Sequence, residues 1–233
     1  EHAYRHSPKV DVTLDQAPCV AETSVCRALV LYAHGALEGK DVIILGDDDL
    51  VSLALGYLGQ VLGAPLARRI VVLETDPAWI ELIRTTSDRE ELGIECVRHD
   101  LRDPLPADLR GRFDTFETDP PYTTAGMTLF VSRAIQALRP GGGGHGLFSF
   151  AHQSPLELLQ IHANLVRMGL VAREIRPTYG EQEGQNAAGA QSQMMLLMTT
   201  AATRALVPQQ PYEAPIYAGE SAPTVRFYVC TRC

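Results

Sequence analysis

The sequence lacks any run of the roughly 20 consecutive apolar residues that a helix needs to cross a bilayer, so no membrane partner is predicted for its 233 residues. Basic residues are also scarce: 20 Lys and Arg face 28 Asp and Glu, which gives a net charge of −8. Such a charge disfavours phosphate backbones and favours cations. Nucleic acid is therefore excluded as the main ligand.

The five cysteines are few, odd in number and mostly scattered. This excludes the disulfide framework of a small secreted protein and favours a reducing cytoplasm. Cys230 and Cys233 lie close together at the C-terminus and could form half of a zinc site. Zinc usually takes four ligands and the sequence has no second C-x-x-C pair, so a free thiol pair is the alternative. No prosthetic group is expected.

Short apolar runs alternate with helical patterns along the middle of the chain. Such runs are typical of buried parallel strands, and the alternation predicts helices on both faces of one sheet. The predicted strands are 41–46, 69–74, 94–97, 113–118, 146–150, 170–176 and 193–200, and the predicted helices are 50–58, one beginning near Pro77, 129–138 and 155–168. We expect an α/β fold: a doubly wound, methyltransferase-like (Rossmann-type) sheet of about seven strands, in which the final hairpin inserts an antiparallel strand.

The chain divides into three predicted segments: a lead-in over residues 1–36, a Rossmann-like catalytic domain over 37–202, and a tail or lid over 203–233. The tail is rich in Pro and Gln and then aromatic, with Tyr212, Tyr217, Phe227 and Tyr228. Its aromatic residues and Glu220 could close over a cleft. Because the chain does not begin with Met, we also expect an N-terminal segment to be missing.

Acidic residues follow the ends of four predicted strands. They are Asp47, Asp48 and Asp49, then Glu74 and Asp76, then Asp100, then Asp119. Ligands of doubly wound sheets bind at the carboxyl ends of the strands, so these seven carboxylates should line one cleft. A helix N-cap would explain one acid per helix, but three consecutive aspartates after Gly46 cost stability unless a cation relieves their repulsion.

Two of these acids indicate a nucleoside. Glu74, at the end of the second strand, has the position that grips ribose hydroxyls in nucleotide-binding folds. Asp100 is placed to accept a hydrogen bond from the exocyclic amino group of adenine, and Asp76 and Leu101 are assigned to the same pocket. The G-x-G-x-x-G motif is absent, and the acids that follow Gly46 in its place disfavour a dinucleotide pyrophosphate.

The three aspartates also disfavour intact S-adenosylmethionine, whose carboxylate normally lies beside the first loop. One carboxylate pair at about 4 Å repels by roughly 4 kcal/mol at an effective dielectric near 20. Without that carboxylate the remaining ammonium is attracted instead. We therefore predict decarboxylated S-adenosylmethionine as co-substrate, with its ammonium held by Asp47 or a neighbour, and a polyamine as second substrate.

Asp119, Pro120, Pro121 and Tyr122 form the most specific motif. It matches the D-P-P-Y signature with which amino-group methyltransferases hold a planar amine. Asp119 and a carbonyl would accept N–H bonds, and Tyr122 would offer a ring face worth about 0.5 to 2 kcal/mol to a cation. Further along, Glu181 and Glu183 could bind a terminal ammonium of the acceptor, with a solvated loop as the alternative.

These motifs together resemble the branched-chain polyamine synthase family, the bis(aminopropyl)spermidine synthases of thermophiles. The matching stretches are Asp15-Gln16, Gly46-Asp-Asp-Asp-Leu50, His99-Asp-Leu-Arg102 with Pro104-Leu-Pro106, Asp119-Pro-Pro-Tyr-Thr123, and Leu129-Phe with Ser132-Arg133. They span most of the chain up to about residue 150.

The resemblance implies transfer of aminopropyl groups from decarboxylated S-adenosylmethionine to the internal secondary amine of spermidine. It also implies a homodimer and a small N-terminal winged-helix-like domain that this chain lacks. Within that reaction we expect Asp49, or Asp48 beside it, to take the proton of the reacting nitrogen. Asp119 and Tyr122 would orient this amine towards the methylene group next to sulfur.

Two alternatives remain open. An amino-directed S-adenosylmethionine-dependent methyltransferase shares the fold and the D-P-P-Y motif, but it predicts a glycine-rich first loop and, for nucleic-acid substrates, a basic surface. A non-catalytic polyamine-binding protein could use the same acidic cleft. Glu74 and Asp100 favour catalysis, because a polyamine binder needs no nucleoside pocket.

Overall fold

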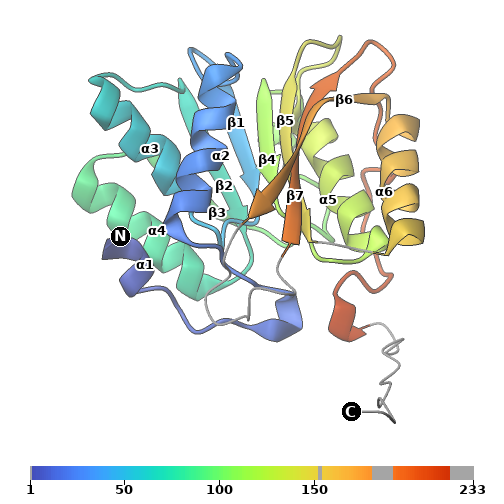
Figure 1. The fold of residues 1–233 in the computed structure, drawn as a ribbon, viewed down its shortest axis with the longest axis horizontal. Coiled ribbons are helices and arrows are strands. Elements are labelled where there is room, and N and C mark those ends of the chain that lie inside the picture. The colour runs from blue at the N-terminus through green and yellow to red at the C-terminus, as the bar shows by residue number, and fades with distance from the viewer. Residues whose placement is uncertain (1, 152–153, 180–190, 221–233) are drawn as a thin grey trace.

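The computed structural model describes residues 2–151, 154–179 and 191–220, which form one seven-stranded sheet (Figure 1). The strands are β1 (Asp41–Leu45), β2 (Arg69–Glu74), β3 (Ile94–Arg98), β4 (Thr115–Thr118), β5 (His145–Ala151), β6 (Leu170–Tyr179) and β7 (Gln191–Thr199). They lie in the order β3-β2-β1-β4-β5-β7-β6. The first five pair in parallel, and β7 inserts antiparallel between β5 and β6. The predicted methyltransferase-like sheet, including its inserted strand, is confirmed.

Helices cover both faces of this sheet (Figure 1). They are α1 (His2–Arg5), α2 (Ala21–Ala33), α3 (Val51–Leu62), α4 (Pro77–Glu90), α5 (Thr124–Ala137) and α6 (Pro155–Arg167), with short 3-10 turns η1 (Val12–Leu14), η2 (Ala107–Leu109) and η3 (Ala218–Glu220). Alternate residues of β1 enter two different cores: Val42 and Ile44 pack with α2, α3 and α4, whereas Ile43 and Leu45 pack with α5 and α6. Burial on both faces explains why this strand is an unbroken apolar run. Across the described ranges, no helix combines the length and apolarity required to span a bilayer.

Helix α5 begins earlier than the sequence predicts, and helix α2 is not among the predicted helices. Helix α5 begins at Thr124 rather than at 129, because the side chain of Thr123 accepts a hydrogen bond from the Gly126 amide and caps the helix early. Helix α2 lies inside the predicted lead-in. Its buried face mixes Ala28 and Leu31 with polar residues, and this mixture conceals the apolar stripe that usually reveals a helix.

The tail up to residue 220 is fixed to α5 through Arg133. This side chain is fully buried, and its guanidinium donates to the carbonyls of Leu101, Pro208 and Gln210 at 2.8 to 2.9 Å. Gln136 adds a bond from its Nε2 to the carbonyl of Val207. The stretch around Arg133 therefore determines the path of the tail across the α5 side of the sheet.

We predict that Gly146→Ala destabilises the protein. Gly146 on β5 is paired with Phe116 on β4, and an added Cβ would lie 2.2 Å from Cζ of that buried ring. Overpacking of this kind typically costs about 1 to 3 kcal/mol. Chemical unfolding should therefore show a lower midpoint. Gly219→Ala, where a Cβ meets nothing within 4 Å, is the control, and equal midpoints for the two variants would contradict the prediction.

Candidate active site

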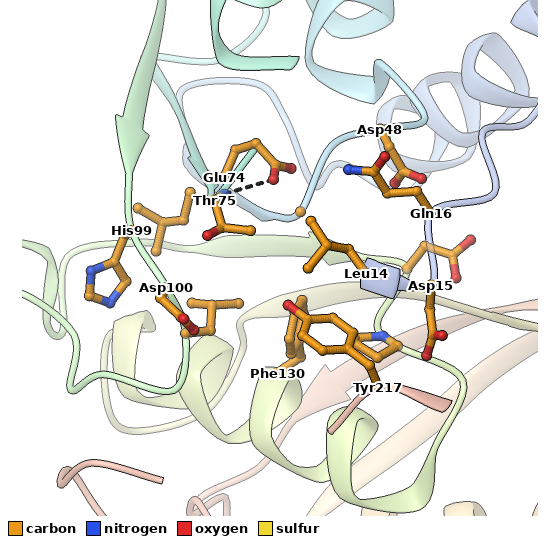
Figure 2. A pocket seen from close by; sticks show the side chains of 15 residues that line it. Leu14, Asp15, Gln16, Asp48, Glu74, Thr75, His99, Asp100, Phe130 and Tyr217 are labelled. Carbon is orange, nitrogen blue, oxygen red and sulfur yellow. Dashed lines mark hydrogen bonds between the residues drawn. The ribbon is translucent and has the colours of Figure 1, made fainter. Parts of the chain in front are cut away.

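A cavity, partly open to solvent, lies at the carboxyl ends of β1, β2, β3 and β4 (Figure 2). Its lining is Leu14, Asp15, Gln16, Gly46, Asp48, Leu73, Glu74, Thr75, His99, Asp100, Leu101, Asp119, Pro121, Phe130 and Tyr217. In this view Glu74 and Asp100 lie on one side, Asp48 and Asp15 on the other, and Tyr217 between them. The predicted cleft at the strand ends therefore exists, and four of the seven predicted acids line it, together with Asp15.

The first two of the three consecutive aspartates do different things. Asp47 is buried, and its carboxylate accepts hydrogen bonds from the amides of Val51 and Ser52 at the start of α3. It does not line the cavity. Asp48 does, and its Oδ2 accepts from the amide of Ala17 at 3.0 Å. Asp47 therefore caps α3, a role that Asp commonly has at a helix start, while its neighbour Asp48 faces the cavity.

The third aspartate points away from the cavity, towards a buried arginine. Asp49 accepts from the amide of Cys19 at 2.6 Å and from Nη1 of Arg27 at 2.5 Å. Arg27 also donates from Nη2 to Asp119 at 2.8 Å and lies 3.4 Å from Glu117. A single guanidinium thus joins three carboxylates, and it provides a cation for one of the three adjacent aspartates, Asp49.

The loop that carries the aspartates is held in an unusual backbone conformation. Leu50 has φ of 55°, a left-handed value that costs a residue with a side chain roughly 1 to 2 kcal/mol. The preceding carbonyl, that of Asp49, accepts hydrogen bonds from the hydroxyls of Tyr4 and Ser24 at 2.7 and 2.5 Å. These two donors fix the peptide between Asp49 and Leu50, and so fix which way each aspartate faces.

The D-P-P-Y motif follows β4. Asp119 lines the cavity, and while its Oδ2 binds Arg27, its Oδ1 has no hydrogen-bond partner in the described part of the chain. Pro121 also lines the cavity, whereas Pro120 and Tyr122 do not. The Tyr122 ring packs edge-on against Phe150 at 6.0 Å between centroids. The structure therefore brings Asp119, but not the Tyr122 ring, to the cavity.

On the side towards β2, Glu74 lines the cavity as predicted. Its Oε1 accepts from the amides of Thr75 and Asp76 at 2.7 and 2.9 Å, and its Oε2 accepts from the amide of Asp47 at 3.0 Å. These bonds fix the carboxylate while leaving it acceptor capacity for a ligand. Asp76 instead caps α4 through Ala78 and does not line the cavity.

Asp100 and Leu101 line the cavity after β3, again as predicted. Both oxygens of Asp100 accept from the guanidinium of Arg102, at 2.7 to 3.2 Å. Burial acts to raise the pKa of Asp100, but the hydrogen bonds and charge of Arg102 outweigh it, so the net pKa is lowered. His99 also lines the cavity, and burial lowers its pKa.

The tail reaches the cavity through Tyr217, whose backbone is held from three directions. Glu220 accepts from the amide of Tyr217 at 3.2 Å, Asp15 accepts from the amide of Ala218 at 2.8 Å, and Thr123 donates to the carbonyl of Ile216 at 2.6 Å. The ring lies under the guanidinium of Arg102, 5.9 Å from its Cζ. Tyr217 thus forms a wall of the cavity.

Burial makes most of these acids weak. It raises the pKa of Asp47 to about 8. Burial and the charge of Asp49 raise the pKa of Asp119 to about 7, although Arg27 opposes this. Burial, followed by the charges of Asp49, Asp119 and Glu74, raises the pKa of Asp48 well above its usual range. The site is therefore short of positive charge when it holds no ligand, and cations are the guests that it favours.

Four predicted site residues, Glu181, Glu183, Cys230 and Cys233, lie outside the described residues. Over the ranges that are described, no group of three or more His, Cys, Asp or Glu side chains is arranged to hold a metal ion.

The sequence reasoning gave no role to Arg27, Asp15 or Gln16. An arginine at the centre of a polar helix face gives no periodic signal, so Arg27 could not be found from pattern alone. The only signal for Asp15 and Gln16 was their place in a stretch that matches the polyamine synthase family.

The comparisons with known proteins agree with this geometry. The model of the branched-chain polyamine synthase A C-terminal domain matches residues 2–213. An uncharacterized protein of Methanocaldococcus jannaschii is 36% identical over 98% of this chain and 56% of its own length. An N(4)-bis(aminopropyl)spermidine synthase of Thermococcus kodakarensis is 41% identical over 60% of this chain and 39% of its own length.

Solved structures show the same relationship. The branched-chain polyamine synthase of Thermus thermophilus, in complex with N4-aminopropylspermidine and 5′-methylthioadenosine, is similar with a TM-score of 0.81 and 27% identity, over 94% of this chain and 67% of that one. A putative RNA methyltransferase of Pyrococcus horikoshii has a TM-score of 0.66 and 16% identity over 83% of this chain and 91% of its own, which shows the shared fold alone.

The chain spans only part of its curated relatives, between 34% and 56% of their length. The family model, in contrast, covers nearly all of the described residues. The chain therefore belongs to the branched-chain polyamine synthase family and corresponds to its C-terminal domain.

Proposed function

We propose that this protein transfers aminopropyl groups from decarboxylated S-adenosylmethionine to the internal secondary amine of spermidine, which yields branched polyamines. The two-sided cavity is the observation that carries the proposal. Glu74 and Asp100 suit a nucleoside on one side. Asp48 on the other side, together with Asp119, whose charge acts on Asp48, suits an amine. The ligands named with the Thermus structure, a branched polyamine and a methylthio nucleoside, support it.

In this reaction the acceptor nitrogen attacks the methylene carbon next to the sulfonium. A carbon–nitrogen bond forms, and the carbon–sulfur bond breaks with its electron pair going to sulfur, which leaves neutral 5′-methylthioadenosine. The nitrogen must give up one proton to be a nucleophile. The chain's contribution is to place the two substrates, to balance their charges and to receive that proton.

Asp48 is the better candidate for the proton acceptor. It lines the cavity, whereas Asp49 is only 4% exposed and has both oxygens occupied by Cys19 and Arg27. The elevated pKa of Asp48 also suits a group that must accept a proton. Of the two aspartates left open by the sequence, we therefore assign the role of base to Asp48.

The remaining roles follow from position. Glu74 is assigned to the ribose hydroxyls and Asp100, with Leu101, to adenine. Asp47 is a poor candidate for the donor's ammonium, because its carboxylate caps α3. Asp15, which lines the cavity, takes its place in the proposal.

The proposal also includes a cellular compartment and an oligomeric state. A reducing cytoplasm is in keeping with free thiols at Cys19, Cys26 and Cys96. The homodimer rests on the family resemblance.

The first prediction concerns the donor. Spermidine incubated with the protein and decarboxylated S-adenosylmethionine should gain aminopropyl groups at its internal nitrogen, as located by fragmentation in a mass spectrometer. Intact S-adenosylmethionine should give no product, because its carboxylate would meet the acids of the first loop. Methyl addition from the intact donor would favour the methyltransferase alternative, and addition at a terminal nitrogen would indicate a linear polyamine synthase.

The second prediction separates the two aspartates. Asp48→Asn should lower kcat by about 10² to 10⁴, the usual contribution of a general base, while titration calorimetry still detects binding of 5′-methylthioadenosine. The matched variant Asp49→Asn should keep more activity and instead lose thermal stability, because Arg27 loses one of its partners. If Asp49→Asn were inactive and Asp48→Asn turned over normally, the assignment would be reversed.

The third prediction concerns pH. With a pKa of about 7, Asp119 is mostly neutral below pH 7 and anionic above it. A folded-state pKa raised above the unfolded value means that the ligand-free protein loses stability as the pH rises through 7. Spermidine should offset this loss, so the thermal shift that it produces should grow between pH 5.5 and 8.5.

The control for this measurement is Asp119→Asn, which removes the titrating group and should flatten the dependence of the shift on pH. A wild-type thermal shift that is constant or that falls as the pH rises would speak against an acidic amine-binding site at Asp119.

A further inference from the structure

Arg27 places one fixed positive charge against the acid that is proposed to hold the reacting amine. Its side chain is 2% exposed. It is faced by the thiol of Cys19 from the segment before α2, by Asp49 from the loop after β1, and by Glu117 and Asp119 from β4 and the loop after it. Every charged neighbour named here is therefore an acid, and one of them, Asp119, lines the cavity.

The proposed reaction contains a conflict that this arrangement can relieve. A free carboxylate beside an ammonium stabilises the protonated form, which binds well but cannot attack carbon. A carboxylate that is already paired with a guanidinium presents almost no net charge and still has an oxygen that can accept a hydrogen bond. An amine bound to such a pair holds its proton less tightly.

The geometry at Asp119 fits the second description. Its Oδ2 is bound by Nη2 of Arg27, and its Oδ1 is buried without a partner in the described ranges. Asp48 lines the same cavity and has no arginine or lysine within salt-bridge distance among the described residues. The two cavity acids assigned to the reacting amine thus differ in one respect: Asp119 contacts a guanidinium, which it shares with Asp49 and Glu117, and Asp48 contacts none among the described residues.

On the basis of the proposed function, we propose that Arg27 is a positioning residue that activates the acceptor amine. It offsets part of the negative charge of Asp119, so that this residue orients the internal nitrogen and holds its proton less tightly. The proton leaves to Asp48, and the freed lone pair forms the new bond to carbon. Arg27 itself touches neither substrate.

A purely structural role of Arg27 leads to a different prediction. Breaking a buried ion pair destabilises a protein by leaving charges uncompensated, so both interpretations expect lower thermal stability in a variant. Only the activating role expects the pH dependence of turnover to move, because the amine beside an unpaired Asp119 keeps its proton to higher pH. The dependence of kcat on pH at saturating substrate reports this step in the bound complex.

The test is the pH profile of kcat for Arg27→Gln between pH 6.5 and 10. Since one pKa unit is a tenfold change in the free amine, we expect kcat to fall by about tenfold or more at pH 7.5 and to recover towards wild type at high pH. The spermidine KM should not rise. Arg27→Lys keeps the charge, so its profile should stay at the wild-type position with lower turnover.

Arg68→Gln is the matched control. This arginine also pairs with carboxylates, those of Asp41 and Asp114, but at the amino ends of β1 and β4, away from the cavity. Its profile should equal that of wild type. Should Arg27→Gln not fold, Arg27→Gln combined with Asp49→Asn removes one acid together with the guanidinium and still leaves Asp119 unpaired, so the same alkaline shift is expected.

A profile for Arg27→Gln that keeps its wild-type position, or a loss confined to KM, would overturn this inference while leaving the proposed function intact. Wild-type protein that forms no product from either donor would overturn both. The wild-type reaction in the same assay therefore distinguishes the two failures.

Discussion

One buried guanidinium makes the acidic end of this sheet possible. Asp49, Glu117 and Asp119 come from two different strand ends and would repel one another if they were brought together alone. Arg27 lies among them, with contacts of 2.5, 3.4 and 2.8 Å. Because Arg27 belongs to α2, the same contacts also fix that helix against the sheet. Charge balance, rather than apolar packing alone, thus sets the shape of the site.

This balance lets neighbouring residues of identical chemistry take different tasks. Of three consecutive aspartates, Asp47 caps a helix, Asp48 faces the cavity and Asp49 pairs with Arg27. The left-handed backbone at Leu50 separates the last of these from the helix that follows. Three identical residues in a row therefore occupy one helix-capping position, one cavity-facing position and one position in a buried ion pair.

The sequence allowed the sheet and much of the cavity to be predicted, because strand ends converge by topology. Glu74, Asp100 and Asp119 needed only a strand assignment to be placed together. The parts that could not be predicted depend on side-chain direction. The turn of the Tyr122 ring towards Phe150, the choice between Asp48 and Asp49, and the burial of Arg27 all require the packed structure. Glu181 and Glu183 lie outside the described residues and stay predictions.

The way in which α5 holds the tail has a consequence for how the sequence of this protein can diverge. Arg133 and Gln136 bind the tail chiefly through main-chain carbonyls, which every amino acid provides. The path of residues 207–210 is therefore largely independent of the side chains that they carry. Substitutions there can alter the surface of the tail without moving the wall that Tyr217 forms, so this surface can diverge on an unchanged scaffold.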